Sequence, residues 1–185
     1  MVAAAQPEVI PAMAEELEQI YRAHHVRVLR TAYRITGRMS DAEDVLQTVF
    51  LRLAARSSRL EATNLEAYLH RAAVNAALDT LRSRQQWGEV ELDDALPPQS
   101  STAFQAIGGG EDSAQIRDWL RHALRGLSPR SAEMFVLRYV EGYGNREIAR
   151  MLDTSAAVVA VILHRTRGQL RKDFRGVMRP TRGTQ

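Results

Sequence analysis

The stretch Asp41–Leu53, DAEDVLQTVFLRL, organises the first half of the chain. Its apolar side chains recur with the spacing of one helical face, which predicts an amphipathic helix. These are Val45, Leu46, Val49, Phe50 and Leu53. Ser40 precedes an acidic first turn and Glu43 follows three residues later, so the sequence predicts an N-cap with a capping box. A second face forms a polar patch, which on periodicity alone is a solvated charged surface. It carries Asp41, Asp44, Gln47 and Thr48.

Length and composition limit the class of protein. A chain of 185 residues allows one domain or two small ones. It has no cysteine, which excludes disulfides and thiolate metal sites and fits a reducing compartment. The first 16 residues lack the pattern of a signal peptide, and no run of 18 apolar residues occurs. We therefore expect a cytoplasmic protein without membrane insertion.

Charge is distributed unevenly along the chain. Residues 1–85 hold 11 Arg and 10 Asp or Glu, residues 86–115 hold 6 Asp or Glu and no Lys or Arg, and residues 116–185 hold 14 Lys or Arg and 6 Asp or Glu. A near-neutral part, an acidic connector and a basic part predict different partners for each. The basic part is suited to a phosphate backbone.

The acidic stretch is flanked by two further predicted helices. The first covers Ala14–Thr36 and ends at Gly37, a typical helix stop, and residues 1–12 are expected to be frayed. After a loop at residues 57–63, Asn64 is a candidate cap for a helix from Leu65 to about Gln85. The expected buried side of this last helix is formed by Leu65, Leu69, Ala72, Ala73, Ala76, Ala77, Leu78 and Leu81.

The region 86–112 contains Pro97-Pro98 and a Gly108–Gly110 triplet and lacks periodicity, so it predicts a flexible acidic linker between two domains. Helical patterns resume beyond it. Ser128 and Pro129 open one helix, and Ser155 caps the last. The expected core side of the first of these is Ala132, Phe135, Val136 and Tyr139. Between them, G-Y-G-N-R-E-I-A-x-x-L-D-T-S-x-x-x-V is a helix-turn-helix signature, with Asp153 in a left-handed turn.

Four motifs together resemble the bacterial sigma-70 family of RNA polymerase sigma factors, and the two-domain organisation resembles its extracytoplasmic-function (ECF) group. The first two are D-A-E-D-x-x-Q-x-x-F and A-Y-L-H-R-A-A-V-N-A-A-L-D-T-L-R-S-R, similar to the core-binding and promoter-melting segments. The others are L-S-P-R-S-A-E-M-F-V-L-R-Y-V-E-G and the terminal H-R-T-R-G-Q-L-R, similar to the C-terminal domain. The resemblance covers about residues 14–85 and 113–175.

The resemblance implies an all-α protein with two small helical domains, 1–85 and 113–185, joined by the flexible acidic linker 86–112. It implies a sigma factor that binds the largest and second-largest subunits of core RNA polymerase, recognises −10 and −35 promoter elements and helps to open the duplex at transcription initiation. An anti-sigma factor is a further expected partner. No enzyme activity, cofactor or metal is expected.

The resemblance also implies three sets of site residues. Core polymerase binding is assigned to Asp41, Glu43, Asp44, Gln47 and Phe50. Binding of −10 DNA is assigned to Arg59, Asn64, Tyr68, Arg71, Asn75, Asp79, Arg82 and Arg84. Binding of −35 DNA is assigned to Arg146, Ser155, Ala157, Val158, Val161, His164, Arg165 and Arg167.

Alternatives remain open for several of these residues. Arg82 and Arg84 are also compatible with a solvated helix end. Where the family commonly has T-V-K-S-R, residues 158–162 read V-V-A-V-I, which lacks two basic residues and gives no guanine readout. These apolar residues are either an altered −35 contact or simply core. The alternative function is a sigma-like regulator that binds polymerase or a protein partner and recognises DNA poorly. An enzyme is disfavoured, because the five His are scattered without a catalytic arrangement.

Overall fold

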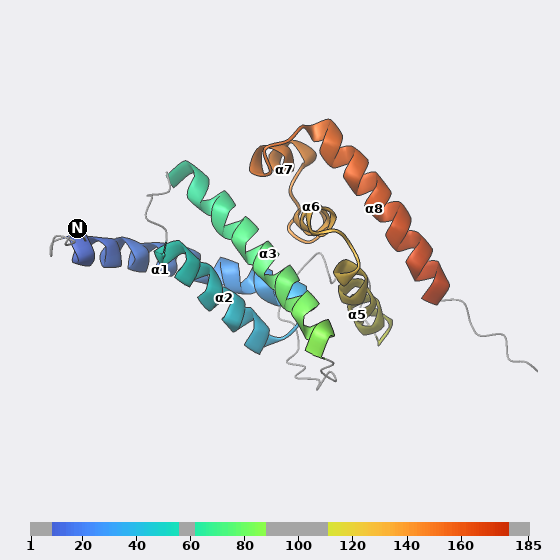
Figure 1. The fold of residues 1–185 in the computed structure, drawn as a ribbon, viewed down its shortest axis with the longest axis horizontal. Helices are drawn as coiled ribbons and strands as arrows, with labels where there is room; N and C mark the ends of the chain where they lie inside the picture. The colour runs from blue at the N-terminus through green and yellow to red at the C-terminus, as the bar shows by residue number, and fades with distance from the viewer. Residues whose placement is uncertain (1–8, 56–61, 88–110, 178–185) are drawn as a thin grey trace, which may run out of the picture.

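The helix α3 (Ala62–Trp87) is packed on two sides, and this determines the architecture. A computed structural model describes residues 9–55, 62–87 and 111–177, and within these ranges the chain forms seven helices and no strand. On one side α3 packs against α1 (Val9–Thr36) and α2 (Met39–Ala54). On the other it packs against α5 (Glu111–Arg125) and α6 (Pro129–Tyr139), as Figure 1 shows.

The first three helices enclose an apolar core that matches the predicted pattern of α2. Val45, Val49 and Phe50 are buried, and Leu46 and Leu53 pack against them. Gly37 ends α1 with a φ of 77°, a left-handed conformation that suits glycine, and its amide donates to the Tyr33 carbonyl oxygen at 2.8 Å. α1 begins at Val9, so residues 9–12, which were expected to be frayed, are helical.

The predicted cap of α2 is wrong. The helix begins at Met39, its N-cap is Arg38, and no side chain bonds to the exposed amides of the first turn. Ser40 is already inside the helix, because the Ala42 amide donates to the Arg38 carbonyl oxygen at 3.1 Å. The cap predicted for α3 is also wrong: this helix begins at Ala62, which places Asn64 within its first turn.

Two residues of α3 that lie outside the predicted buried stripe are also buried. Leu69, Ala73, Ala77 and Leu81 are buried as expected, but so are His70 and Val74. An amphipathic helix is expected to bury one face, whereas a helix that is packed between two neighbours buries two. The second face is covered by the second half of the chain.

The second half folds as a helix-turn-helix unit, with α7 (Asn145–Met151) and α8 (Ala156–Val177) packed on each other and α6 packed against both. Ser128 caps α6, accepting from the Ser131 amide at 3.3 Å, and Ser155 caps α8, accepting from the Val158 amide at 3.2 Å. Asp153 adopts a φ of 48° in the turn. These three predictions are confirmed, whereas Tyr139, expected in the core, is 39% exposed.

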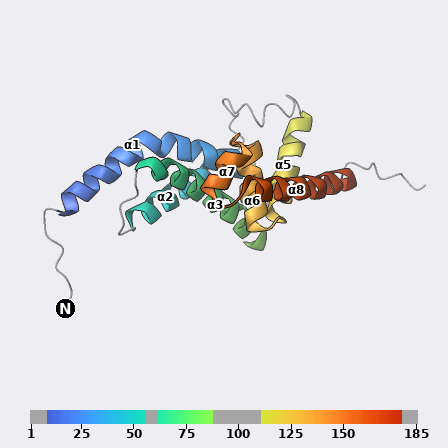
Figure 2. The ribbon, with the colours of Figure 1, turned by 90° about the horizontal axis from the view of Figure 1, so that it is seen from above.

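The two halves lie side by side, joined along α3 and α6, with α8 at the outer edge of the second half (Figure 1). Figure 2 shows the same order from above, with α1 reaching out at one end and α8 at the other. The predicted linker lies mostly outside the described residues. Its two ends are helical, because α3 continues to Trp87 and α5 begins at Glu111.

Candidate polymerase and DNA interface

The polar edge of α2 is exposed along most of its length. Glu43, Asp44 and Gln47 all face solvent. Phe50 is buried beneath them and meets the ring of Tyr21 edge to face at 4.9 Å. Three of the five residues expected to bind core polymerase are therefore presented at the surface, and Phe50 supports the helix that presents them.

Asp41, another acidic candidate on α2, is buried and paired within the protein. Its Oδ1 lies 2.8 Å from a guanidinium nitrogen of Arg84, near the end of α3. Both side chains are largely covered, and a buried ion pair that loses one partner leaves an uncompensated charge. One residue expected to bind polymerase and one expected to bind −10 DNA thus join α2 to α3 in the free protein.

The candidate −10 residues of α3 follow a helical spacing that places them on one side. Arg71, Asn75, Asp79 and Arg82 are four, four and three residues apart, and we call them the α3 polar face. Arg82 donates to the Asp79 carboxylate at 3.2 Å near the exposed end of this face. Tyr68, one turn before it, is half-buried. Arg59 and the side chain of Asn64 lie outside the described residues.

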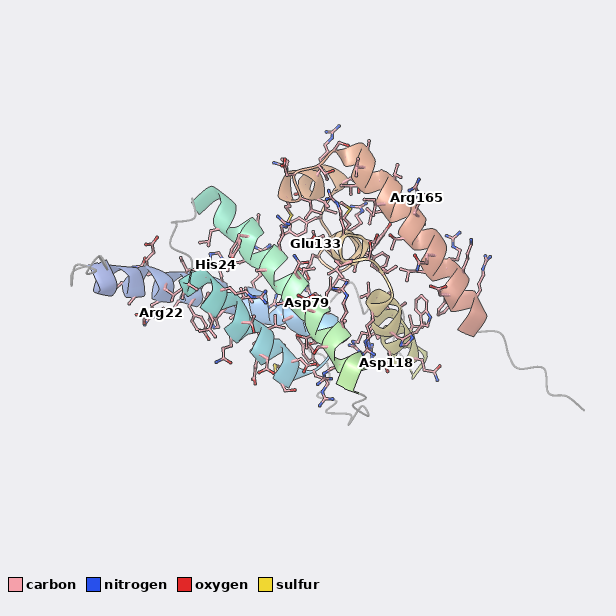
Figure 3. All side chains as sticks on the ribbon, viewed as in Figure 1. Arg22, His24, Asp79, Asp118, Glu133 and Arg165 are labelled. Carbon is pink, nitrogen blue, oxygen red and sulfur yellow. The ribbon has the colours of Figure 1, made fainter. Side chains whose placement is uncertain are left out.

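Half of the α3 polar face is occupied by a carboxylate from α6. The Oε1 atom of Glu133 accepts from Arg71 Nε at 3.1 Å and from Asn75 Nδ2 at 3.0 Å. Arg71 also donates to the carbonyl oxygen of Met151, at the end of α7, at 2.8 Å. Figure 3 shows Glu133 between α6 and α3. The two α3 residues therefore contact the second half of the chain.

A second carboxylate, Glu141, contacts the first half from the turn after α6. It accepts from Thr31 Oγ1 at 3.0 Å and from Arg34 at 3.5 Å, both on α1. Its side chain is only 4% exposed, and His70 Nδ1 lies 3.6 Å from its Oε2. We call the contacts of Glu133 and Glu141 with α1 and α3 the two-glutamate interface.

Burial perturbs two rings beside Glu141. Desolvation lowers the pKa of His70 below 6.5, an effect that the carboxylate of Glu141 opposes. Among the described residues, neither ring nitrogen of His70 has a hydrogen-bond partner, and its ring meets Tyr143 edge to face at 5.6 Å. Burial also raises the pKa of Tyr143.

Sequence analysis did not assign a role to Glu133, Glu141 or His70. The sequence does hold one signal, because Glu133 is a charged residue within the otherwise apolar run Ala132–Leu137. In the structure every residue of this run is buried. A helix that buries only one face cannot bury six consecutive residues, so the run indicates a helix that is covered on two sides. A carboxylate buried there requires hydrogen-bond donors. Which donors it meets depends on the tertiary fold.

The N-terminal half of α8 has an apolar surface. Val158 and Val161 are 43% and 50% exposed, whereas Val159 is fully buried. The suggestion that Val158 and Val161 are core is therefore wrong, and it holds only in part for Ile162, which packs against the core. The exposed side, which we call the recognition face, carries Ala157, Val158, Ala160, Val161, His164 and Arg165.

The remaining −35 candidates surround the recognition face. Arg146 on α7, Ser155 at the cap and Arg167 on α8 are exposed. Arg165 lies on the side of α8 directed away from α3 (Figure 3). The −35 candidates are therefore exposed, whereas Arg71, Asn75 and Arg84 of the −10 set are bonded to residues of other helices.

Within the described parts of the chain, no cluster of three or more His, Asp or Glu side chains has a metal-binding arrangement. Nor is any of the described helices both long and apolar enough to cross a membrane.

Comparison with known proteins identifies both halves. The family model described as Sigma-70 region 2 matches residues 20–87, which contain α2 and α3. The model described as Sigma-70, region 4 matches residues 117–170, which contain the helix-turn-helix. The fold is similar to that of the sigma factor RpoE from Bartonella quintana, crystallised with the anti-sigma factor NepR, with a TM-score of 0.53 at 19% identity over 89% of this chain and 99% of that one.

Curated relatives extend the match across both halves. The chain is 32% identical over 160 residues to the ECF RNA polymerase sigma factor SigE of Mycolicibacterium smegmatis, which covers 83% of this chain but only 60% of that protein. It is 30% identical over 167 residues to the RNA polymerase sigma-E factor of Streptomyces coelicolor, covering 86% of each. With both regions matched in order and relatives aligned across them, the chain belongs to the extracytoplasmic-function group of the sigma-70 family of RNA polymerase sigma factors.

Proposed function

We propose that this protein is a transcription initiation factor that binds core RNA polymerase, recognises promoter DNA through −10 and −35 contacts and helps to separate the strands. The observation that carries the proposal is the presence of both sigma-70 regions in one chain, with the polar edge of α2 exposed. An exposed acidic edge above a complete apolar core is available to a partner without cost to the fold.

The chemistry required of the protein is binding and not bond-making. Strand opening needs a base to be held outside the stack, at a cost of a few kcal/mol that contacts must offset. The α3 polar face supplies guanidinium and amide donors suited to bases and phosphates. Arg165 and Arg167 on α8 are suited to phosphates. The protein accordingly acts without catalytic residues or a cofactor, and an anti-sigma factor is a partner that would control its access to polymerase.

The polymerase contact is tested by reversing the charge of the α2 edge. Asp44→Arg with Gln47→Ala changes two exposed residues, and the matched control Glu15→Arg with Gln19→Ala makes the same changes on exposed positions of α1. We expect the α2 variant to lose retention of core polymerase in a pull-down, with unchanged helical circular dichroism, while the control retains it. Equal retention by both variants would remove the α2 edge from the interface.

The initiation activity is tested by transcription in vitro. Core polymerase with and without the protein is incubated with fragmented genomic DNA, and the 5′ ends of the transcripts are sequenced. A set of start sites that requires the protein and shares upstream sequence at two positions supports the proposal.

A second candidate function follows from the apolar recognition face. Val158 and Val161 are exposed on a helix that lacks the two basic residues expected at positions 160 and 162, so α8 is also suited to a protein partner. In that case the protein is a regulator that binds polymerase without selecting promoters. It would retain core polymerase in the pull-down and yield no start sites of its own.

A further inference from the structure

The outer side of α2 has two unlike halves. Its exposed residues recur at the spacing of one helical stripe and are Ser40, Glu43, Asp44, Gln47, Leu51 and Ala54. The first half carries the carboxylates of Glu43 and Asp44. The second half is apolar, and Leu51 is 61% exposed, more than any other large hydrophobic side chain that the structure describes. This combination suits a partner that is itself part apolar and part basic.

The exposed side of α8 has two matching halves. The recognition face comes first along the helix and is apolar at Val158 and Val161. Arg171 and Arg175 follow Val161 by 10 and 14 residues, close to three and four helical turns, so they lie on the same side of α8. Lys172 is beside them, and all three are exposed. We call these three residues the basic end of α8, and it continues the recognition face along the helix.

The two sides match when the helices run antiparallel. Leu51 then meets the apolar start of α8, and the carboxylates of α2 meet its basic end. Asp44 and Leu51 are seven residues or about 10 Å apart along α2, and Val161 and Arg171 are ten residues or about 15 Å apart along α8. The long side chain of Arg171 can span the remainder. A parallel arrangement would set the carboxylates against the apolar start of α8, so charge selects the antiparallel orientation.

Within one molecule the two sides are kept apart. In Figure 1, α2 lies in the first half and α8 at the outer edge of the second, with α3 and α6 between them, and the two are also apart in Figure 2. Each exposed side also points away from the core that its own helix covers. A second copy of this chain, by contrast, offers a matching side to each.

We propose that this protein self-associates head to tail: the outer side of α2 in one molecule docks antiparallel on the recognition face and basic end of α8 in a second copy. Each added molecule leaves one α2 side and one α8 side free, so the contact can repeat. Two helices in contact form a small interface, so the association is weak and falls with salt. The inference is independent of the proposed function, although the assembly covers the surfaces which that function assigns to polymerase and to −35 DNA.

The first measurement is sedimentation velocity of the full chain at low salt. We expect the sedimentation coefficient to rise with protein concentration in the micromolar to millimolar range and to return to the monomer value at high salt. A monomer at every concentration overturns the proposal and leaves both sides to other partners.

Reversing the charge of either side tests the match. We expect Glu43→Lys with Asp44→Lys, and Arg171→Glu with Lys172→Glu, each to sediment as a monomer when alone. An equal mixture of the two variants should form dimers, because one retains an intact α8 side and the other an intact α2 side. Failure of the mixture to associate, with intact circular dichroism in both variants, contradicts the proposed pairing.

Matched controls separate this contact from net charge. Glu15→Lys with Glu18→Lys, and Arg22→Glu with Arg30→Glu, make the same charge changes at exposed positions of α1. Each control should associate as the unaltered protein does. A loss as large as in the α2 and α8 variants would assign the effect to net charge and overturn the proposal.

The apolar part of the contact has its own pair of variants. Leu51→Ser should weaken association several-fold, because a central apolar side chain carries much of the energy of a small interface. Val26→Ser, at a position on α1 that is 54% exposed, should leave it unchanged. Equal association of the two variants would remove Leu51 from the contact and contradict the antiparallel match.

The orientation is tested by disulfide trapping between molecules. The chain has no cysteine, so a mixture of Ala54→Cys on α2 and Ala157→Cys on α8, both exposed, should form the mixed disulfide under mild oxidation. The matched control Gly168→Cys lies about 16 Å farther along α8, and its Cβ would meet nothing within 4 Å. It should form much less mixed disulfide with Ala54→Cys. Equal yields in the two mixtures would indicate random collision and overturn the antiparallel contact.

Discussion

The two surfaces expected to meet DNA are built in opposite ways. The α3 polar face is rich in donors, but Glu133 and Met151 occupy those of Arg71 and Asn75. The recognition face of α8 is open to solvent, but its centre is apolar. If both surfaces meet DNA, we expect the covering of one and the apolar character of the other each to lower the DNA affinity of the isolated protein. The difference between the two surfaces is one of coverage and one of chemistry, and the two can be tested separately.

The largest expected effect tests the register of α8, on which half of the comparison depends. Val159→Asp places a carboxylate at a fully buried position and should destabilise the protein by about 3 kcal/mol or more. Val158→Asp, one residue earlier and 43% exposed, should change stability by only about 0.5 kcal/mol. Thermal unfolding of the two variants measures the difference. Similar losses of stability would mean that the recognition face is not at the surface.

The next effect concerns Arg84, which was expected to bind DNA. Arg84→Ala leaves the Asp41 carboxylate buried without its guanidinium, and should cost about 2 kcal/mol. Asp41→Asn in the same chain should recover part of this loss, because a neutral amide is less costly to bury than a carboxylate that has lost its guanidinium. Urea unfolding of the single and double variants measures the coupling. Additive losses would show that the pair does not join α2 to α3 and would return Arg84 to the DNA-binding candidates.

The features that depend only on the residues of one helix or turn could be predicted from the sequence. The apolar stripe of α2, the Ser128 and Ser155 caps and the Asp153 turn are set by local geometry, and all are observed. The caps at Ser40 and Asn64 failed for a related reason. Both helices begin earlier in the chain than expected, which places these two residues inside the first turn.

The occupied α3 polar face could not have been predicted in this way. Its spacing was read correctly, but a pattern within one helix does not reveal which other helix covers it. The pairing of Arg71 with Glu133 joins residues 62 positions apart, and that of Thr31 with Glu141 joins residues 110 apart. The site assignments themselves, from the α2 edge to the recognition face, stay predictions until binding is measured.

A third prediction uses pH to open the covered face without altering the α3 donors. His70 is buried between the halves, and desolvation holds its pKa below 6.5, with Glu141 and Glu66 opposing the effect and Arg27 and Arg34 adding to it. When the halves separate, the ring is exposed and its pKa returns towards 6.5. Between the lowered pKa and 6.5, the form with separated halves (the open form) therefore binds a proton that the form with packed halves (the closed form) does not.

The sign of the effect follows from this difference in proton binding. The closed form should be most stable above pH 6.5 and lose stability as the pH falls below that value. We expect the distance distribution between spin labels at Ala23→Cys on α1 and Gln169→Cys on α8 to broaden on acidification from pH 7 to about pH 5.5, and His70→Gln to show a much smaller change. Tighter closure at low pH would mean that protonated His70 is stabilised more by Glu141 than it is destabilised by burial.

The smallest expected effect concerns the open but apolar surface. A substitution at Ile162 would disturb packing, because this residue packs against the core. We therefore introduce positive charges at the neighbouring exposed positions 160 and 161. Ala160→Lys with Val161→Arg supplies two cations to the recognition face and should steepen the dependence of DNA affinity on salt by about one unit for each additional phosphate that the protein neutralises. The matched control Gln169→Lys with Asp173→Asn raises the net charge by the same two units farther along α8. Titrations of a duplex of mixed sequence across a salt series measure the slopes. If the slope rises no more than in the control, α8 does not approach the DNA backbone through this face, and a protein partner becomes the better occupant of Val158 and Val161.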